Sequence, residues 1–184
     1  MDTDGRFLPA DGETQGELVL RAPWLTEGYY NEPHKGAELW AGGWLHTGDV
    51  ATLDAFGVID IRDRIKDVIK TGGEWISSLA LEDLVSRHPA VREVAVVGIA
   101  DPQWGERPFA LLVVREGHVI DARELKEHLK PFVELGHLSK WAIPSQIAVV
   151  TEIPKTSVGK LDKKRIRVDI IEWQANNSTF LSTL

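Results

Sequence analysis

The sequence contains no cysteine among its 184 residues. Disulfide bonds, thiol catalysis and cysteine metal sites are therefore excluded, and nothing in the composition marks an oxidising compartment. Long apolar runs are missing as well, because none approaches the roughly 20 residues that a membrane-spanning helix needs. The acidic start at residues 1–5 lacks the basic and apolar regions of a signal peptide. We therefore expect a soluble, cytoplasmic protein without a membrane span.

Positive charge is also in short supply. Lysine and arginine number 21 against 28 aspartates and glutamates, which gives a formal net charge of -7. Nucleic acid and anionic membrane surfaces both require a positive field on the protein that binds them. We expect no nucleic-acid partner, and any anionic ligand must be held by local groups. Hydrophobic residues make up 43% of the chain, which is enough for the core of one domain or two small ones.

Short apolar segments alternate with turn residues from Gly16 to Gly57. The segments GELVLRAP, EGYYNEP and AGGWLHTGDVATLDAFGVIDI predict several short strands joined by tight turns. Charge density then rises in RDRIKDVIKTGG, and we place a domain boundary near Lys66. Residues 1–66 are expected to form a short-stranded β subdomain, and residues 67–184 a small α+β domain.

Helical and strand patterns alternate beyond this boundary. Residues 78–88, SLALEDLVSRH, carry apolar residues at helical spacing, and residues 121–134 form an amphipathic pattern with Asp121 as the expected N-cap. β-Branched runs predict strands at residues 91–101, 107–114 and 145–154. This order favours an α+β fold with helices packed on a small sheet. The last residues, 176–184, are expected to form a loosely held tail.

The segment PKTSVGKLDKK surrounds Lys160 with turn residues. It is not a Walker A loop, because the positions that would require glycine and serine or threonine hold Pro154 and Leu161. Gly159 can act as a hinge that lets the ammonium of Lys160 project beyond the domain surface. The alternative is a solvated basic face, which the segment taken alone favours.

The segment GWLHTGDVA places a carboxylate behind a backbone that a ligand can approach closely. Asp49, in the Thr-Gly-Asp turn, can accept two hydrogen bonds from a ribose diol. A plain β-turn explains the same three residues. His46 is a candidate general base, but a single histidine at the end of a strand is more often structural.

The segment IRDRIKDVIKTGGEWIS joins a basic strand to a double glycine. Arg64, Lys66 and Lys70 precede Gly72 and Gly73. Alternating charges usually form a solvated segment, and this explanation stays open. Two glycines directly after a basic strand also permit the close passage of a thin ligand or of another backbone.

Taken together and in this order, the three segments resemble the adenylate-forming enzymes, which include acyl-CoA synthetases, firefly luciferase and the adenylation domains of peptide synthetases. The stretches TGGEWISS, DPQWGERP and PKTSVGKLDKK are most similar to the fatty-acyl-CoA synthetase branch. The resemblance covers nearly the whole chain. It implies that residues 1–66 are the end of a large N-terminal domain with its hinge, and that residues 67–184 are a mobile C-terminal domain.

The resemblance implies a reaction in two steps. A carboxylate attacks the α-phosphate of magnesium-bound ATP to give an acyl adenylate and pyrophosphate, and the thiol of CoA then attacks the adenylate to form a thioester. The implied partners are a small carboxylic acid, here a fatty acid, together with ATP, Mg2+ and CoA. Lys160 matches the adenylation lysine of the family, Asp49 its ribose-binding aspartate, and Arg64 an arginine near the ribose and phosphates.

The remaining site residues are implied by the same resemblance. Lys66 lies at the hinge position. Lys70, Gly72 and Gly73 match the segment past which the pantetheine arm of CoA travels. Trp75 stands where some relatives carry an arginine, so a phosphate contact from that position is in doubt. We expect no metal ion held by protein side chains.

The phosphate loop, adenine pocket and acyl pocket that this family carries upstream are absent from the sequence. We therefore expect a fragment that is inactive alone and that works with a missing N-terminal domain of the same chain. Two alternatives stay open. One is a non-enzymatic docking or regulatory module, and the other is an adenylation domain that transfers its acyl group to a carrier protein.

Overall fold

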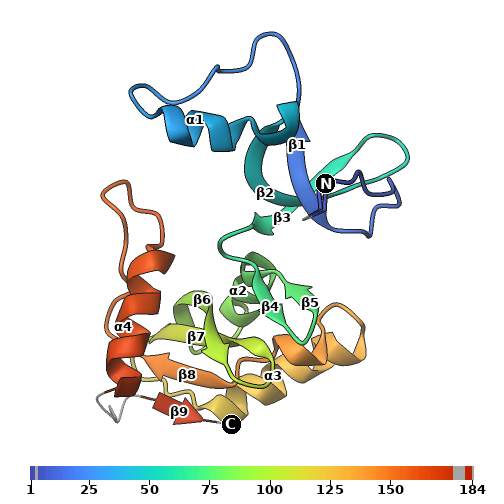
Figure 1. The fold of residues 1–184 in the computed structure, drawn as a ribbon. Helices are drawn as coiled ribbons and strands as arrows, with labels where there is room; N and C mark the ends of the chain where they lie inside the picture. The colour runs from blue at the N-terminus through green and yellow to red at the C-terminus, as the bar shows by residue number, and fades with distance from the viewer. Residues whose placement is uncertain (3, 176–180, 184) are drawn as a thin grey trace. The chain divides into compact units, whose positions relative to one another are not determined.

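The computed structural model describes residues 1–2, 4–175 and 181–183. It divides into two compact units, Met1–Lys66 and Asp67–Leu184, which we call unit 1 and unit 2 (Figure 1). Helices combine with mainly antiparallel sheets, so the α+β fold expected from the sequence is confirmed. None of the helices in the described residues is long and apolar enough to cross a membrane.

Unit 1 is built on a three-stranded antiparallel sheet in the order β1-β2-β3. Its elements are β1 (Gly16–Leu20), α1 (Pro33–Leu39), the 3-10 turn η1 (Ala41–Gly43), β2 (Leu45–Leu53) and β3 (Ile59–Arg64). The strand expected at EGYYNEP is wrong, because this segment is a loop that leads into α1. Pro33 opens that helix, where its fixed φ suits the first turn and its missing N–H is not needed.

Unit 2 contains a six-stranded sheet along the path β5-β4-β7-β8-β9, with β6 also paired to β7. Its elements are β4 (Ile69–Thr71), β5 (Glu74–Ile76), α2 (Ser78–Ser86), β6 (Val91–Asp101), β7 (Gly105–Val114), α3 (Ala122–Glu134), the 3-10 turn η2 (Lys140–Ala142), β8 (Gln146–Val149), α4 (Lys163–Ala175) and β9 (Leu181–Thr183). The predicted elements that became α2, β6, β7, α3 and β8 are confirmed in that order. Asp121 caps α3 as predicted, since its Oδ1 accepts a hydrogen bond from the Glu124 N–H at 2.7 Å.

Unit 2 also has elements that the sequence patterns did not reveal. β4 and β5 form an antiparallel hairpin closed by Gly72 and Gly73, and α4 buries Ile166 and Ile170 one turn apart among charged neighbours. Of the tail predicted at residues 176–184, residues 176–180 and 184 lie outside the described residues. The described part forms β9, which pairs antiparallel with β8.

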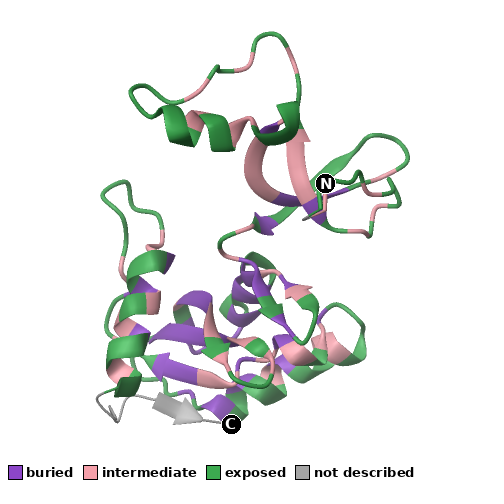
Figure 2. Cartoon of the chain, viewed as in Figure 1, coloured by how far each residue is buried: buried purple, intermediate pink, exposed green. Residues whose placement is uncertain are grey.

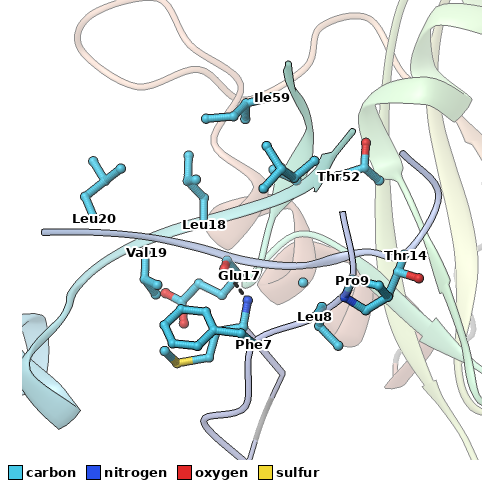
Figure 3. Close-up of a pocket in the computed structure, with 14 residues that line it drawn as sticks. Phe7, Leu8, Pro9, Thr14, Glu17, Leu18, Val19, Leu20, Thr52 and Ile59 are labelled. Carbon is cyan, nitrogen blue, oxygen red and sulfur yellow. Dashed lines mark hydrogen bonds between the residues drawn. The ribbon is translucent and has the colours of Figure 1, made fainter. Parts of the chain in front are cut away.

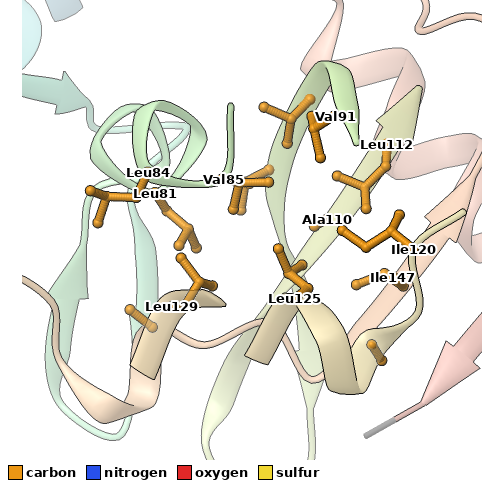
Figure 4. Close-up of a cluster of buried hydrophobic side chains, with 14 of the residues drawn as sticks. Leu81, Leu84, Val85, Val91, Ala110, Leu112, Ile120, Leu125, Leu129 and Ile147 are labelled. Carbon is orange, nitrogen blue, oxygen red and sulfur yellow. The ribbon is translucent and has the colours of Figure 1, made fainter. Parts of the chain in front are cut away.

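The sheet of unit 2 is apolar on both faces, and helices cover each of them (Figure 2). One cluster of buried side chains joins the sheet to α2 and α3, and it includes Leu81, Leu125 and Ile147 (Figure 4). A second cluster joins the opposite face to α4 through Ile166 and Ile170. Successive side chains on a strand point to opposite faces. This explains why the central strands are apolar at consecutive positions.

His88 is a buried histidine between α2 and β6, with 7% of its surface exposed. Its Nδ1 accepts a hydrogen bond from the Ala90 N–H at 3.2 Å, and its Nε2 lies 3.7 Å from Oε1 of Glu124. The ring meets that of His128 edge-on, with centroids 4.9 Å apart. Burial, and then the charges of His128 and His118, lower the pKa of His88 below its usual value, while Glu124 acts in the opposite direction.

The free energy of unfolding should therefore fall in acid. Because the pKa of His88 is lowered on folding, the unfolded chain binds more protons than the folded chain once the pH drops below about 6.5. The stability that neutral His88 contributes is complete above that pH and is lost as the pH falls through the folded pKa. One proton limits this slope to about 1.4 kcal/mol per pH unit. Urea unfolding of the chain at a series of pH values above and below about 6.5 measures this slope.

His88→Asn is the variant that isolates this effect, because it keeps an acceptor for the Ala90 N–H and cannot titrate. We expect a flatter dependence of stability on pH in this variant. His137→Asn changes an exposed histidine and serves as the control. An unchanged slope in His88→Asn would show that another group causes the acid sensitivity.

Candidate active site

Asp49 and Arg64, predicted from separate segments, lie side by side on neighbouring strands of unit 1. They are partners in the register of β2 and β3, and Nε of Arg64 lies 2.7 Å from Oδ1 of Asp49. The Arg64 side chain is 55% exposed and that of Asp49 is 19% exposed. Carboxylate oxygens have further lone pairs, and a guanidinium has further N–H groups. This pair can therefore bind sugar hydroxyls on one side and an anion on the other.

The Thr-Gly-Asp segment, expected to be a turn, lies instead inside strand β2, where the register with β1 is irregular. Oγ1 of Thr47 accepts from the Asp49 N–H at 3.0 Å and donates to the Leu18 carbonyl at 2.7 Å. Nη1 of Arg64 donates to the Thr47 carbonyl at 3.2 Å. Gly48 has a φ of 71°, a conformation that favours glycine. These bonds to both neighbouring strands hold the carboxylate of Asp49 in one orientation.

Glu17 is a residue of this site that the sequence analysis missed. Its Oε1 accepts from the Gly48 N–H at 3.1 Å, and its Oε2 lies 2.7 Å from Nδ1 of His46. The other ring nitrogen of His46 lies 3.1 Å from the Ala41 carbonyl oxygen. His46 therefore makes structural contacts, and Glu17 joins β1 to Gly48 of β2, directly before Asp49. Its one sequence signal is a charge inside the apolar strand GELVL.

Gly72 and Gly73 form the turn of the β4-β5 hairpin, with φ values of 58° and 86°. Lys70 pairs with Trp75 across this hairpin, and Nζ of Lys70 lies 5.3 Å from the centroid of the Trp75 ring. A Cβ on Gly72 would lie 3.2 Å from the ring of Trp104, whereas a Cβ on Gly73 would meet no atom of the described residues within 4 Å. Backbone conformation alone thus favours glycine at both positions, and the space beside Gly73 is open.

Glu106 supports this hairpin from β7. Its Oε2 accepts a hydrogen bond from the Lys70 N–H at 2.9 Å. The same carboxylate lies over Gly98 of β6, where a Cβ would come within 2.8 Å of Oε2. Gly98 therefore leaves the room that Glu106 needs to reach β4.

Tryptophan and basic side chains cluster beside Gly72. The Gly72 N–H donates to the Trp104 carbonyl at 2.9 Å, and the ring centroids of Trp104 and Trp141 are 4.5 Å apart. Arg107 donates to the Trp141 carbonyl at 3.0 Å, and Nζ of Lys140 lies 4.9 Å from the centroid of the Trp141 ring. The sequence analysis did not assign these residues to the site, although DPQWGERP contains Trp104 and Arg107.

Lys160 lies in an exposed hairpin between β8 and α4. A single bridge pairs Lys155 with Leu161, and the Thr156 N–H donates to the Lys160 carbonyl at 2.7 Å. Gly159 closes the turn with a φ of 79°. The side chain of Lys160 is exposed and forms no ion pair with any described residue. Its ammonium is therefore available to an anionic ligand.

The predicted residues fall into separate groups. Asp49 and Arg64 form one pair on unit 1, and Lys66 is the last residue of that unit. Within unit 2, the hairpin ahead of α4 and the β4-β5 hairpin lie apart (Figure 1). No hydrogen bond or ion pair between described residues joins Lys160 to Lys70.

A cavity of about 270 Å3 lies on unit 1 between the N-terminal segment and the sheet (Figure 3). Its lining is mainly apolar and includes Phe7, Leu18 and Ile59. None of the predicted site residues is among the described residues that line it. We therefore assign this cavity no part in the candidate site.

Comparison with known proteins identifies a family that part of this chain matches. Residues 80–160 match the AMP-binding enzyme C-terminal domain. The chain is 46% identical to the long-chain-fatty-acid–CoA ligase of Thermus thermophilus, over 90% of this chain and 30% of that protein. It is 42% identical to the 3-methylmercaptopropionyl-CoA ligase of Ruegeria lacuscaerulensis, over 91% of this chain and 30% of that protein.

Solved structures agree with these relatives. The amide bond synthetase McbA of Marinactinospora thermotolerans has a TM-score of 0.76 and 35% identity, over 92% of this chain and 33% of that one. The o-succinylbenzoate CoA synthetase of Bacillus subtilis, solved with an acyl-adenylate intermediate, has a TM-score of 0.74 and 31% identity, over 85% of this chain and 31% of that one. The chain thus spans about a third of the length of these relatives.

Residues 80–160 therefore match the AMP-binding enzyme C-terminal domain family. The resemblance to adenylate-forming enzymes that the sequence motifs indicated is confirmed, and the relatives named above include CoA ligases.

The contact between Gly98 and Glu106 can be tested through stability. Gly98→Ala should push the Glu106 carboxylate away from the Lys70 N–H, and Glu106→Ala removes it. Each change should cost about 1 kcal/mol, the value of one hydrogen bond. Because both changes remove the same bond, their costs should not add in the double variant. Urea unfolding of the four proteins measures this, and fully additive costs would show that Gly98 serves another purpose.

Proposed function

We propose that the chain is part of an ATP-dependent, AMP-forming acyl-CoA ligase in which units 1 and 2 supply different parts of one active site. The observation that carries this proposal is the grouping of the motif residues. Asp49 and Arg64 meet on neighbouring strands with the Arg64 side chain exposed, and the Lys160 side chain, which forms no ion pair among the described residues, lies on an exposed hairpin. A purely structural or docking module has no need of this combination.

In the proposed first step, a carboxylate oxygen of the acid attacks the α-phosphorus of magnesium-bound ATP. A new O–P bond forms, the bond to the bridging oxygen breaks, and pyrophosphate leaves with the electron pair. Two anions must approach each other in this step. The ammonium of Lys160 stabilises the charge that develops between carboxylate and phosphate oxygens. Lys160 is therefore the proposed catalytic residue of adenylation.

Asp49 and Arg64 are the proposed nucleotide contacts. The Asp49 carboxylate retains lone pairs for the ribose hydroxyls beside its contact with Arg64. The Arg64 guanidinium, with 55% of its side chain exposed, can reach phosphate oxygens through its remaining N–H groups. Ile59 and Ile61 on β3 are exposed apolar residues. Their exposure supports the proposal that unit 1 packs against the further part of a large N-terminal domain.

In the proposed second step, the CoA thiol loses its proton to water and its sulfur attacks the acyl carbonyl carbon of the adenylate. A C–S bond forms, the C–O bond to the phosphate breaks, and AMP leaves with the bonding electrons. Lys66 would be the hinge about which unit 2 turns between the two half-reactions, since it is the last residue of unit 1. The pantetheine arm would pass the β4-β5 turn, where Gly73 has open space beside it. Lys70 flanks this turn and would attract the negative charges of CoA.

A fatty acid is the proposed acid substrate, because relatives of this chain include ligases named for long-chain and medium-chain fatty acids. Transfer to a carrier protein or to an amine is the competing function, and the likeness to an amide bond synthetase makes the amine a specific alternative. Offering CoA and an amine to the complete enzyme in competition decides between these acceptors.

The 184-residue chain alone is expected to form no thioester. It should also bind magnesium-ATP only weakly, which calorimetry measures.

Lys160→Ala in the complete enzyme tests the proposed role directly. Adenylation, followed by pyrophosphate exchange, should fall by at least about 100-fold, the scale for loss of one preorganised charge stabiliser. Thioester formation from supplied acyl adenylate should continue. Lys164→Ala removes a neighbouring exposed charge and is the control. If Lys160→Ala slowed both half-reactions equally, Lys160 would serve the fold or both steps.

Gly73→Leu tests the passage of CoA. Its φ of 86° means that any larger residue strains the turn by roughly 1–3 kcal/mol, so loss of activity alone is not informative. Gly57, in the β2-β3 turn, has a φ of 83° and equally open space, which makes Gly57→Leu a matched control for strain. Only Gly73→Leu should block transfer to CoA while adenylation continues. Equal effects of the two variants on transfer would contradict the proposed path.

A further inference from the structure

Lys163, the first residue of α4, is a buried lysine that the proposed chemistry does not use. Only 9% of its side chain is exposed. Its Nζ donates to Oγ of Ser78 at 2.7 Å and lies 2.8 Å from Oε1 of Glu82. Removing two charges from water is costly, and a well-packed apolar pair is often at least as stable. The stability of the fold alone therefore gives little reason for this pair.

The pair lies at the edge of the sheet where two helices meet. Oε1 of Glu82 also accepts a hydrogen bond from the Val96 N–H of β6 at 2.8 Å. Val96 pairs with Ala110 of β7 in the strand register, and its N–H donates to the Glu82 side chain. One carboxylate thus connects α2, the edge of β6 and the start of α4.

Little chain separates this junction from Lys160. The Asp162 N–H donates to the Pro154 carbonyl at 2.9 Å, and Oδ1 of Asp162 accepts from the Arg165 N–H at 3.0 Å at the start of α4. The hairpin that carries Lys160 is otherwise closed by short-range bonds, such as that from the Gly159 N–H to the Thr156 carbonyl at 2.9 Å. These bonds shape the hairpin. It is tied to β6 by an ion pair at 2.9 Å between Nζ of Lys155 and Oε2 of Glu93, which is partly exposed and therefore weak.

We propose that Lys163 is a positioning residue for adenylation, which orients the Lys160 hairpin by fixing the start of α4 to Glu82 and Ser78. This inference rests on the role of Lys160 in the proposed function. A second ion pair holds the same helix one turn later, where Nη2 of Arg167 lies 3.1 Å from Oδ1 of Asp67. These two ion pairs therefore add to the apolar packing of α4, and the first of them is three residues from Lys160.

The anchor can be tested in the 184-residue chain itself by amide hydrogen exchange. Lys163→Met alone leaves a buried, unpaired Glu82, so the informative variant is Lys163→Met with Glu82→Gln. The glutamine still offers an oxygen to the Val96 N–H. We expect exchange at the amides of Thr156 and Gly159 to become at least about 10-fold faster, because the hairpin opens locally. Amides of the central strand β7 should keep their protection. Unchanged exchange in the hairpin, or failure of the double variant to fold, overturns the proposal.

The same variants in the complete enzyme test the consequence for catalysis. The double variant should slow pyrophosphate exchange by about 10- to 100-fold with little change in KM for ATP, since small misplacements of a catalytic group cost this much. Thioester formation from supplied acyl adenylate should be retained. Lys163→Arg, which keeps a cation there, should retain most adenylation, and the exposed Lys164→Met is the control.

An equal loss in both half-reactions, or no loss in a folded protein, shows that Lys163 does not position Lys160. Lys160→Ala, measured in parallel, separates this failure from failure of the proposed function. If Lys160→Ala itself spares adenylation, the role of Lys160 is wrong, and the exchange data still decide whether Lys163 anchors the hairpin.

Discussion

Burial of both faces of the central sheet is the constraint on which the rest of unit 2 depends. A sheet that is apolar on two sides needs a helical layer on each, and α2 with α3 covers one face while α4 covers the other. The apolar side chains of these strands and helices therefore pack against one another in the core. Segments that can contact a ligand are left where the chain departs from these layers, at the β4-β5 hairpin and at the hairpin ahead of α4.

Two kinds of ion pair occur in the candidate site, and burial separates their roles. In the pair of Asp49 and Arg64 the arginine side chain is exposed, and a pair that solvent can reach contributes at most about 1 kcal/mol. A nucleotide can therefore rearrange it at small cost. The pair of Glu82 and Lys163 is almost completely shielded from solvent. Removing one partner of a buried pair lowers the free energy of unfolding by roughly 3–5 kcal/mol. Such a pair keeps its geometry and suits the support of a neighbouring group.

Much of unit 2 was predictable from the sequence, because burial leaves a pattern in the residues. The strand that became β6 is a run of β-branched residues buried at consecutive positions, and the helix capped by Asp121 shows helical spacing. α4 escaped detection because its buried positions, Ile166 and Ile170, are separated by charged residues. The β4-β5 hairpin escaped because Gly72 and Gly73 were interpreted as room for a ligand or for another backbone, and not as a hairpin turn. Two adjacent residues with positive φ also form a hairpin turn.

The motif residues could be found from the sequence, but the groups that hold them could not. Three glutamates each accept a hydrogen bond from a backbone N–H of a distant segment. The donor is Gly48 of β2 for Glu17, Lys70 of β4 for Glu106, and Val96 of β6 for Glu82. In a sequence, a single glutamate is indistinguishable from a solvated surface charge. Only the tertiary fold brings each carboxylate to its N–H. Since the three supports share no residue, each candidate segment can be weakened without loosening the other two.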